Sequence, residues 1–174
     1  VQCYPQAFAA AAMMLGELAT VPRALILDVG GFTADYLLLK NGRADLSTCD
    51  SLENGVILLY NRIRSKANSD LDILLEETDV DAILLQGQGS SYGEAAAALV
   101  EYQAQEFVND MLGALRERQL DLRTGRVIFV GGGACLLRRQ IEASGKVAHP
   151  VFVEDVNANA KGFEYLYRCT VTEV

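Results

Sequence analysis

Residues that bind structural metals are scarce in this sequence. It contains one histidine, His149, and four cysteines that lie far apart and form no CxxC pair, which argues against a zinc site. We expect these cysteines to be buried or half-buried free thiols of a reducing cytoplasm; they are Cys3, Cys49, Cys135 and Cys169. No apolar run approaches the roughly 20 residues that a helix needs to span a bilayer, so we expect no membrane partner.

Positive charge is also limited. The chain has 15 Lys and Arg against 23 Asp and Glu, a net charge of −8, and no basic stripe, so direct nucleic-acid binding is not expected. An acidic chain can still bind phosphate, because backbone N–H groups and a metal ion supply a local positive field. The hydrophobic fraction of 51% and the charged fraction of 22% indicate a folded domain with a real core.

The chain begins at Val1, within an apolar segment, rather than at methionine. We interpret residues 1–174 as one domain cut from a longer protein, since 174 residues suit a single domain. The stretch 66–93 is at most a small insertion in it.

The first third of the sequence predicts a helix followed by three strands. A short strand end at 1–4 precedes Pro5, which suits the first turn of a helix over 6–18. Apolar runs predict strands over 24–29 and 34–40, and the Asn41-Gly42 hairpin signal predicts a third strand over 43–48. These three strands form an antiparallel meander.

The rest of the sequence predicts helices that alternate with two further strands. The strands are expected at 126–130 and 151–153, with 82–85 as another brief strand or an extended link and 86–93 as a polar loop. The order indicates an α/β fold with a mixed five-stranded sheet and flanking helices. The expected helices are 53–64, 70–77, 91–119, 134–143 and 158–167.

The segment from Asp28 to Asp35 is a candidate phosphate-binding hairpin. Gly30 and Gly31 let the backbone turn tightly and approach a phosphate, and successive N–H groups in such a turn bind anions. Thr33 adds a hydroxyl, and Asp28, at the end of an apolar strand, can hold Mg²⁺ through water. Taken alone, the segment is equally compatible with an ordinary Gly-Gly hairpin capped by its two aspartates.

Two other segments carry weaker signals. A buried strand runs into Gly131, Gly132 and Gly133 and then opens a helix, a place where a ligand can meet backbone, although a tight turn explains it as well. Gln6 follows Pro5 at the start of an alanine-rich helix, where it can orient a water or simply be a polar first-turn residue.

Together, these three segments resemble the second half of the actin-like ATPase core, which has a ribonuclease-H-like fold. Actins, DnaK-type chaperones, sugar kinases and plasmid-segregation actins share this core. The hairpin is similar to the family's D-x-G-x-x-T-x-D phosphate loop, the triple glycine to its nucleoside contact, and Pro5-Gln6 to its water-orienting position. Residues 157–163 are similar to the A-N-A-x-G-F ending of the plasmid-segregation type, ParM/StbA.

This resemblance implies ATP or GTP, with Mg²⁺, bound in a cleft between two domains, of which this chain supplies the C-terminal one. It implies that Asp28 lies near the metal, that Gly30, Gly31 and Thr33 contact phosphate, and that Gln6 orients the attacking water. Gly131, Gly132 and Gly133 face the ribose or base, and Glu53 is a ribose contact by analogy. Phe32 stands where the family commonly has a small or polar residue.

The resemblance also implies a working role. The first domain's phosphate loop is absent from this sequence, so we expect the isolated chain to bind nucleotide weakly and to hydrolyse no ATP at a useful rate. The full-length protein is expected to assemble into filaments in the bacterial cytoplasm, with a DNA-binding adaptor for plasmid segregation. The alternatives are a non-hydrolysing scaffold of the cell-division or pilus type and a sugar or acetate kinase.

Overall fold

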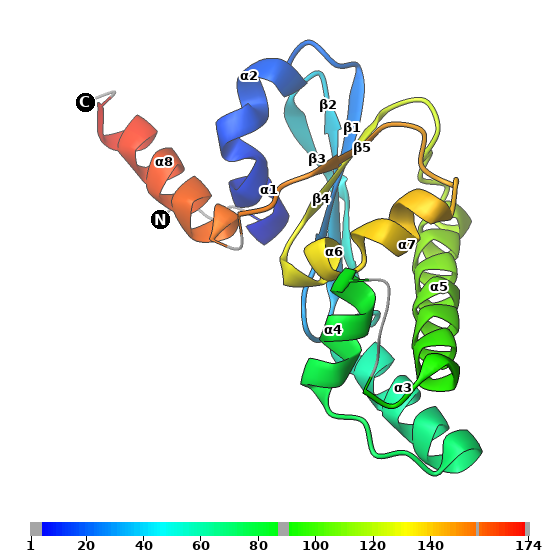
Figure 1. The fold of residues 1–174 in the computed structure, drawn as a ribbon. Helices are drawn as coiled ribbons and strands as arrows, with labels where there is room; N and C mark the ends of the chain where they lie inside the picture. Colours follow the sequence, from blue (N-terminus) through cyan, green and yellow to red (C-terminus); the bar gives the residue numbers. More distant parts are fainter. Residues whose placement is uncertain (1–4, 87–90, 156, 173–174) are drawn as a thin grey trace.

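A computed structural model describes residues 5–86, 91–155 and 157–172 of the chain (Figure 1). Its centre is a five-stranded sheet in the order β3-β2-β1-β4-β5. Strands β1, β2 and β3 pair antiparallel as the predicted meander, whereas β4 lies parallel to β1 and β5 parallel to β4. The α/β fold class with a mixed five-stranded sheet is therefore confirmed. The strands are β1 (Arg23–Val29), β2 (Ala34–Lys40), β3 (Arg43–Leu52), β4 (Arg126–Val130) and β5 (Pro150–Phe152).

The meander owes its second turn to Asn41 and Gly42. Their φ angles of 50° and 73° are left-handed, as a two-residue hairpin requires, and this is the conformation that the Asn-Gly pair favours. Strand β3 runs four residues further than predicted. It is an edge strand with mostly exposed, polar side chains, and of its last four residues only Leu52 is buried, so the apolar signal there is weak.

Helices cover both faces of the sheet (Figure 1). In β1, Leu25, Leu27 and Val29 pack into the larger core cluster, while Ala24 and Ile26 belong to the smaller one on the opposite face. The larger cluster includes α3 (Val56–Leu71), α4 (Glu77–Gln86), α5 (Glu94–Glu117), α6 (Gly132–Leu136) and α7 (Arg138–Ala143). The smaller one includes α1 (Gln6–Ala11), η1 (Ala12–Met14), α2 (Leu15–Leu18) and α8 (Ala158–Thr172). Because side chains alternate along a strand, Asp28 faces the same side as Ala24 and Ile26.

The predicted elements between 64 and 85 are wrong. Helix α3 continues to Leu71 and ends at Asp72, whose φ is 57°, so residues 70–77 do not form a helix of their own. Residues 82–85 belong to helix α4, not to a strand or a link. Short apolar stretches do not separate strand from helix, and the buried spacing of Val80, Ile83 and Leu84 is that of a helix face.

Other boundaries differ less. The helix expected over 134–143 is divided into α6 and α7, and that over 6–18 into α1, η1 and α2. The expected strand end at 1–4 and residues 87–90 of the loop expected at 86–93 lie outside the described residues. Cys49, Cys135 and Cys169 are free, as predicted, but Cys49 and Cys169 are exposed rather than buried.

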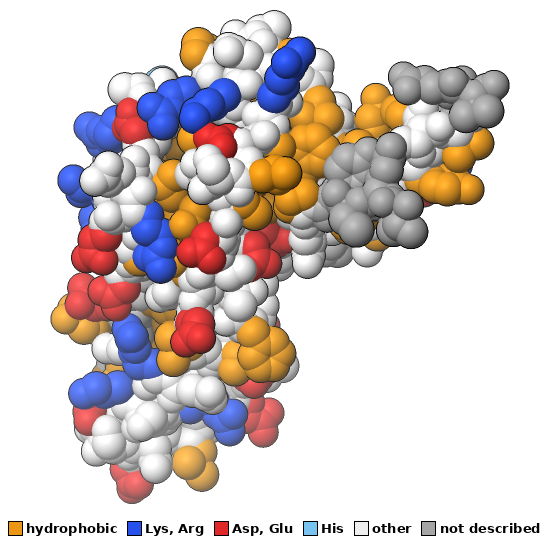
Figure 2. Space-filling model, turned by 180° about the vertical axis from the view of Figure 1, so that it is seen from behind, with side chains coloured by type: hydrophobic (Ala, Val, Ile, Leu, Met, Phe, Trp, Pro, Cys, Tyr) orange, Lys and Arg blue, Asp and Glu red, His pale blue; other side chains and the backbone are white. Residues whose placement is uncertain are grey.

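Helix α8 forms an arm beside the main body, and hydrophobic side chains are visible along it in Figure 2. Its first two turns are anchored through the buried Ala158 and Gly162, whereas its later apolar side chains are exposed. Those exposed side chains include Phe163, Tyr165, Tyr167 and Val171. None of the helices within the described ranges is long and apolar enough to cross a membrane.

Candidate functional site

The hairpin between β1 and β2 is closed by a hydrogen bond of 2.9 Å from the Gly30 N–H to the Thr33 carbonyl. The hairpin is also hydrogen-bonded to the start of helix α3. The N–H groups of Gly55, Val56 and Ile57 donate to the carbonyls of Phe32, Gly30 and Gly31, at 3.1, 3.1 and 2.9 Å.

These bonds have two consequences. They satisfy the first donors of α3, which have no partner inside the helix. They also occupy hairpin carbonyls, while the N–H groups of Gly31, Phe32 and Thr33 have no backbone acceptor within the described part of the chain. Unpaired N–H groups in a tight turn can donate hydrogen bonds to a bound anion.

Gly55 is a residue that the sequence reasoning missed. A Cβ at this position would overlap the Gly31 carbonyl oxygen and the Phe32 carbonyl carbon. Its φ of −83° is open to any residue, so the requirement for glycine comes from the close approach of the hairpin. A glycine directly before a predicted apolar helix face was the available signal.

Asp28 lies in β1, two residues before Gly30 of the hairpin, and only 5% of its surface is exposed. Its Oδ2 accepts a hydrogen bond of 2.7 Å from the Asn159 Nδ2 at the start of α8. Gly131, at the end of β4, has a φ of +90°, and a Cβ there would lie 2.5 Å from the Asp28 Oδ1. Burial raises the pKa of the Asp28 carboxyl, the Asn159 hydrogen bond lowers it, and the charge of Asp35 raises it further.

A hollow of about 470 Å³ opens at the carboxyl ends of β1 and β4. Gly30 and Gly31 line it from the hairpin, and Gly132 and Gly133 line it from the turn after β4. A Cβ on Gly132 would meet no atom within 4 Å, whereas one on Gly133 would press against Val29 and Val56. The remaining lining residues are Val56, Tyr60, Asp81, Leu85, Cys135 and Leu136.

The wall of this hollow is held by polar contacts. The Tyr60 hydroxyl donates to the Asp81 Oδ1 at 2.5 Å, which joins α3 to α4. Burial, followed by this hydrogen bond to the carboxylate, raises the pKa of the Tyr60 phenol, so it stays a neutral donor.

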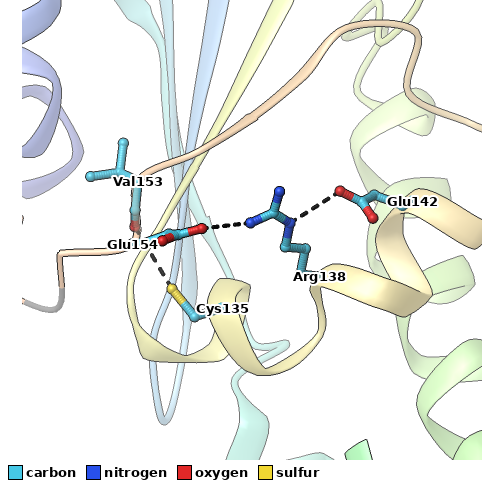
Figure 3. A network of polar contacts seen from close by, with 5 residues as sticks. All are labelled: Cys135, Arg138, Glu142, Val153 and Glu154. Atoms are coloured by element: carbon cyan, nitrogen blue, oxygen red, sulfur yellow. Dashed lines mark hydrogen bonds and ion pairs between the residues drawn. The ribbon is translucent and has the colours of Figure 1, made fainter. Parts of the chain in front are cut away.

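On the other side, the Cys135 thiol donates to the Val153 carbonyl at 3.7 Å (Figure 3). Arg138 bridges Glu142 and Glu154 at 3.1 and 2.6 Å (Figure 3). Its guanidinium also lies 4.9 Å from the centroid of the Phe152 ring. These contacts hold α6 and α7 against β5 and the residues that follow it. They therefore also hold the glycine turn, residues 131–133, which leads from β4 into α6.

Not all predicted site residues reach the hollow. Asp28 and Gly131 lie together beside it rather than in its lining. Gln6 is exposed at the start of α1, on the face of the sheet to which Asp28 points, and Thr33 lies in the hairpin. Glu53 is exposed between β3 and α3 and does not line the hollow.

A second hollow, of about 460 Å³, is lined by the end of α5, by the segment between α5 and β4, and by residues between α7 and β5. Arg116, Arg123 and Lys146 are among its lining residues, and it contains none of the predicted site residues.

A comparison with protein families identifies the architecture. The family model described as archaeal actin homologue MreB-like, C-terminal, matches residues 26–143, more than half of the chain. The chain belongs to this MreB-like family. The matched range contains the hairpin, α3 and the glycine turn. No curated protein matches the chain.

Solved structures share the MreB-like fold. The archaeal actin homologue Ta0583 is 19% identical over 95% of this chain and 55% of its own, with a TM-score of 0.66. The Alp12 filament structure is 17% identical over 95% and 52%, with a TM-score of 0.69. ParM from Bacillus thuringiensis with ADP is 12% identical over 88% and 48%, with a TM-score of 0.57. The chain thus spans about half the length of these proteins. The predicted identity as an actin-like C-terminal domain is confirmed.

The residues of this MreB-like domain fit a hydrated magnesium ion. The Asn159 Oδ1 is buried and has no hydrogen-bond partner among the described residues, and it belongs to the amide that binds the Asp28 carboxylate. Oxygen donors suit Mg²⁺, which keeps several waters and binds one or two carboxylates plus substrate phosphates. Within the described residues, no group of three His, Cys, Asp or Glu side chains is placed to hold a metal by itself.

Proposed function

We propose that this chain is the nucleotide-binding C-terminal domain of an actin-like ATPase that takes ATP or GTP with Mg²⁺. In this proposal, the hairpin residues Gly30, Gly31 and Thr33 bind phosphate oxygens. Gly131, Gly132 and Gly133 face the nucleoside, and Gly132 and Gly133 line the space that it occupies. Asp28 holds Mg²⁺ through water, and Mg²⁺ neutralises phosphate charge.

The proposal keeps Gln6 as the residue that orients the attacking water, because it begins the helix on the face to which Asp28 points. The proposal also keeps Glu53 as a ribose contact by analogy, although Glu53 is not among the residues that line the hollow.

One observation carries the proposal. Two glycine pairs from opposite halves of the chain, Gly30-Gly31 and Gly132-Gly133, line the same hollow at the carboxyl ends of parallel strands. This edge is where open α/β sheets bind their ligands, and the glycines let a ligand approach the backbone. Structures of the similar Ta0583 and ParM proteins with ADP support a nucleotide as that ligand.

We propose that the longer protein functions as a filament in the cytoplasm. The Alp12 filament structure supports self-association, and the likeness to ParM supports plasmid segregation with a DNA-binding adaptor as the finer assignment. Because the matching family model describes archaeal homologues, the proposed host is an archaeon or a bacterium. The alternatives are a non-hydrolysing scaffold and a sugar or acetate kinase. Co-sedimentation of the longer protein with ATP and with ADP separates a filament former from a kinase.

Nucleotide binding is tested first on the chain itself, by an NMR titration with ADP, which measures weak affinities. Gly132 lines the hollow, and a Cβ added there meets no described atom within 4 Å, so we expect Gly132→Leu to fill part of the hollow and weaken ADP binding about tenfold, or about 1.4 kcal/mol. Gly16→Leu is the matched control, because its added Cβ also meets nothing within 4 Å and lies outside the hollow. Equal affinities for the two variants would refute the proposed site.

A further inference from the structure

Asn159 gives Asp28 a hydrogen-bond partner from a distant part of the chain. It lies in the first turn of α8, and its Nδ2 donates to the Asp28 Oδ2 at 2.7 Å. Asp28 is 5% exposed, so this bond is shielded from competing water. A charge-assisted bond in such surroundings is about twice as strong as a neutral one, and it fixes the direction of the carboxylate.

Several contacts hold the first turns of α8, and with them the amide of Asn159. The Ala158 N–H donates to the Asp155 carbonyl at 2.9 Å, and Lys161 pairs with the Asp155 carboxylate at 2.6 Å. Gly162 lies directly on α1, since a Cβ there would overlap the Ala9 carbonyl. The motif at 157–163 therefore places the side-chain amide of Asn159 next to the Asp28 carboxylate.

The other end of the same amide has no partner in the part of the chain that the structure describes. Within residues 5–86, 91–155 and 157–172, the buried Asn159 Oδ1 accepts no hydrogen bond, although Nδ2 is satisfied. A buried acceptor left without a donor costs about 1–3 kcal/mol, and native structures rarely tolerate this without a functional reason. The unpaired oxygen therefore indicates a donor that arrives with a ligand.

We propose that Asn159 is a positioning residue for the metal-bound nucleotide, an inference that rests on the proposed function. Its Nδ2 aims the Asp28 carboxylate, and its Oδ1 accepts a hydrogen bond from a water of the hydrated Mg²⁺ that accompanies the phosphates. Through this amide, α8 contributes to the ion's outer shell while the glycine hairpin contributes to phosphate binding.

The test is the gain in ADP affinity that Mg²⁺ provides, measured on the 174-residue chain by NMR titration with and without Mg²⁺. Removing a partner from the outer shell of a metal site typically costs 10–100-fold in affinity. We expect Asn159→Ala to lower the affinity for ADP with Mg²⁺ about tenfold while changing the metal-free affinity less than about twofold. Asn159→Leu keeps the volume of the side chain and should behave in the same way.

Two controls separate this role from a structural one. Asn157→Ala changes the same residue type two positions earlier, where the residue is exposed, and should leave both affinities unchanged. Asp28→Ala should cost as much as Asn159→Ala, and the double variant should cost no more, because the two residues act as a unit.

A loss of affinity that is equal with and without Mg²⁺, or no loss in either variant, would overturn the role of Asn159 alone. A wild-type chain that binds no ADP would overturn it together with the proposed function.

Discussion

The contact between the hairpin and helix α3 leads to a sharp prediction for Gly55. In Gly55→Ala, the new methyl group overlaps backbone atoms of Gly31 and Phe32, and backbone atoms cannot move aside as the end of a flexible side chain can. The hairpin must shift away from α3, and three hydrogen bonds lengthen or break: those donated by the N–H groups of Gly55, Val56 and Ile57.

The expected cost follows from these contacts. Each hydrogen bond contributes about 0.5–1.5 kcal/mol net, so the loss of three amounts to about 3 kcal/mol. The φ of −83° is favourable for alanine and adds no strain. Urea unfolding should therefore show Gly55→Ala less stable by about 3 kcal/mol, and ADP binding should weaken because the hairpin has moved.

The matched control is Gly113→Ala within α5, where a Cβ meets no atom within 4 Å. It should stabilise the chain by about 0.5–1 kcal/mol, as expected for alanine in place of glycine inside a helix. If Gly55→Ala unfolds at the same urea concentration as the wild type and binds ADP equally well, the coupling of hairpin and helix is wrong.

Two further predictions concern the α8 side of the site. Gly162→Ala places a methyl group against the Ala9 carbonyl and should cost about 1–3 kcal/mol in urea unfolding; an unchanged midpoint would contradict the packing of α8 on α1. Burial raises the folded-state pKa of Asp28 above its ordinary value of 3.8, so the chain loses stability as pH rises from about 4 through that raised pKa. Asp28→Asn should therefore raise the unfolding temperature at pH 7, leave it nearly unchanged at pH 3, and abolish the gain in ADP affinity from Mg²⁺; a lower unfolding temperature at pH 7 would contradict the burial of this charge.

Much of the fold was predictable because the strong local signals agree with the final structure. The apolar runs of β1 and β4 and the Asn41-Gly42 turn appear where the sequence indicates them. The errors lie between 64 and 85, above all in α4, where a short apolar segment at 82–85 fits a strand or a helix equally well. There the packing of Val80, Ile83 and Leu84 decides, and packing is not a local property.

The candidate site was only partly predictable for the same reason. The glycine pairs stood out because each lies next to a buried strand, and the hollow brings them together. Gly55 and Asn159 gave no comparable signal, since their roles depend on backbone contacts and a hydrogen bond between segments far apart in the sequence. Glu53 is predicted by analogy alone; it does not line the hollow, and its ribose contact stays a prediction.

The most direct test of the account maps ADP onto the chain through its backbone amide NMR signals in the presence of Mg²⁺. The account predicts that the largest shifts fall on Gly30, Gly31, Gly132 and Gly133, with saturation on addition of ADP. Shifts centred on the second hollow, around Arg116, Arg123 and Lys146, or no saturable shifts at all, would contradict it.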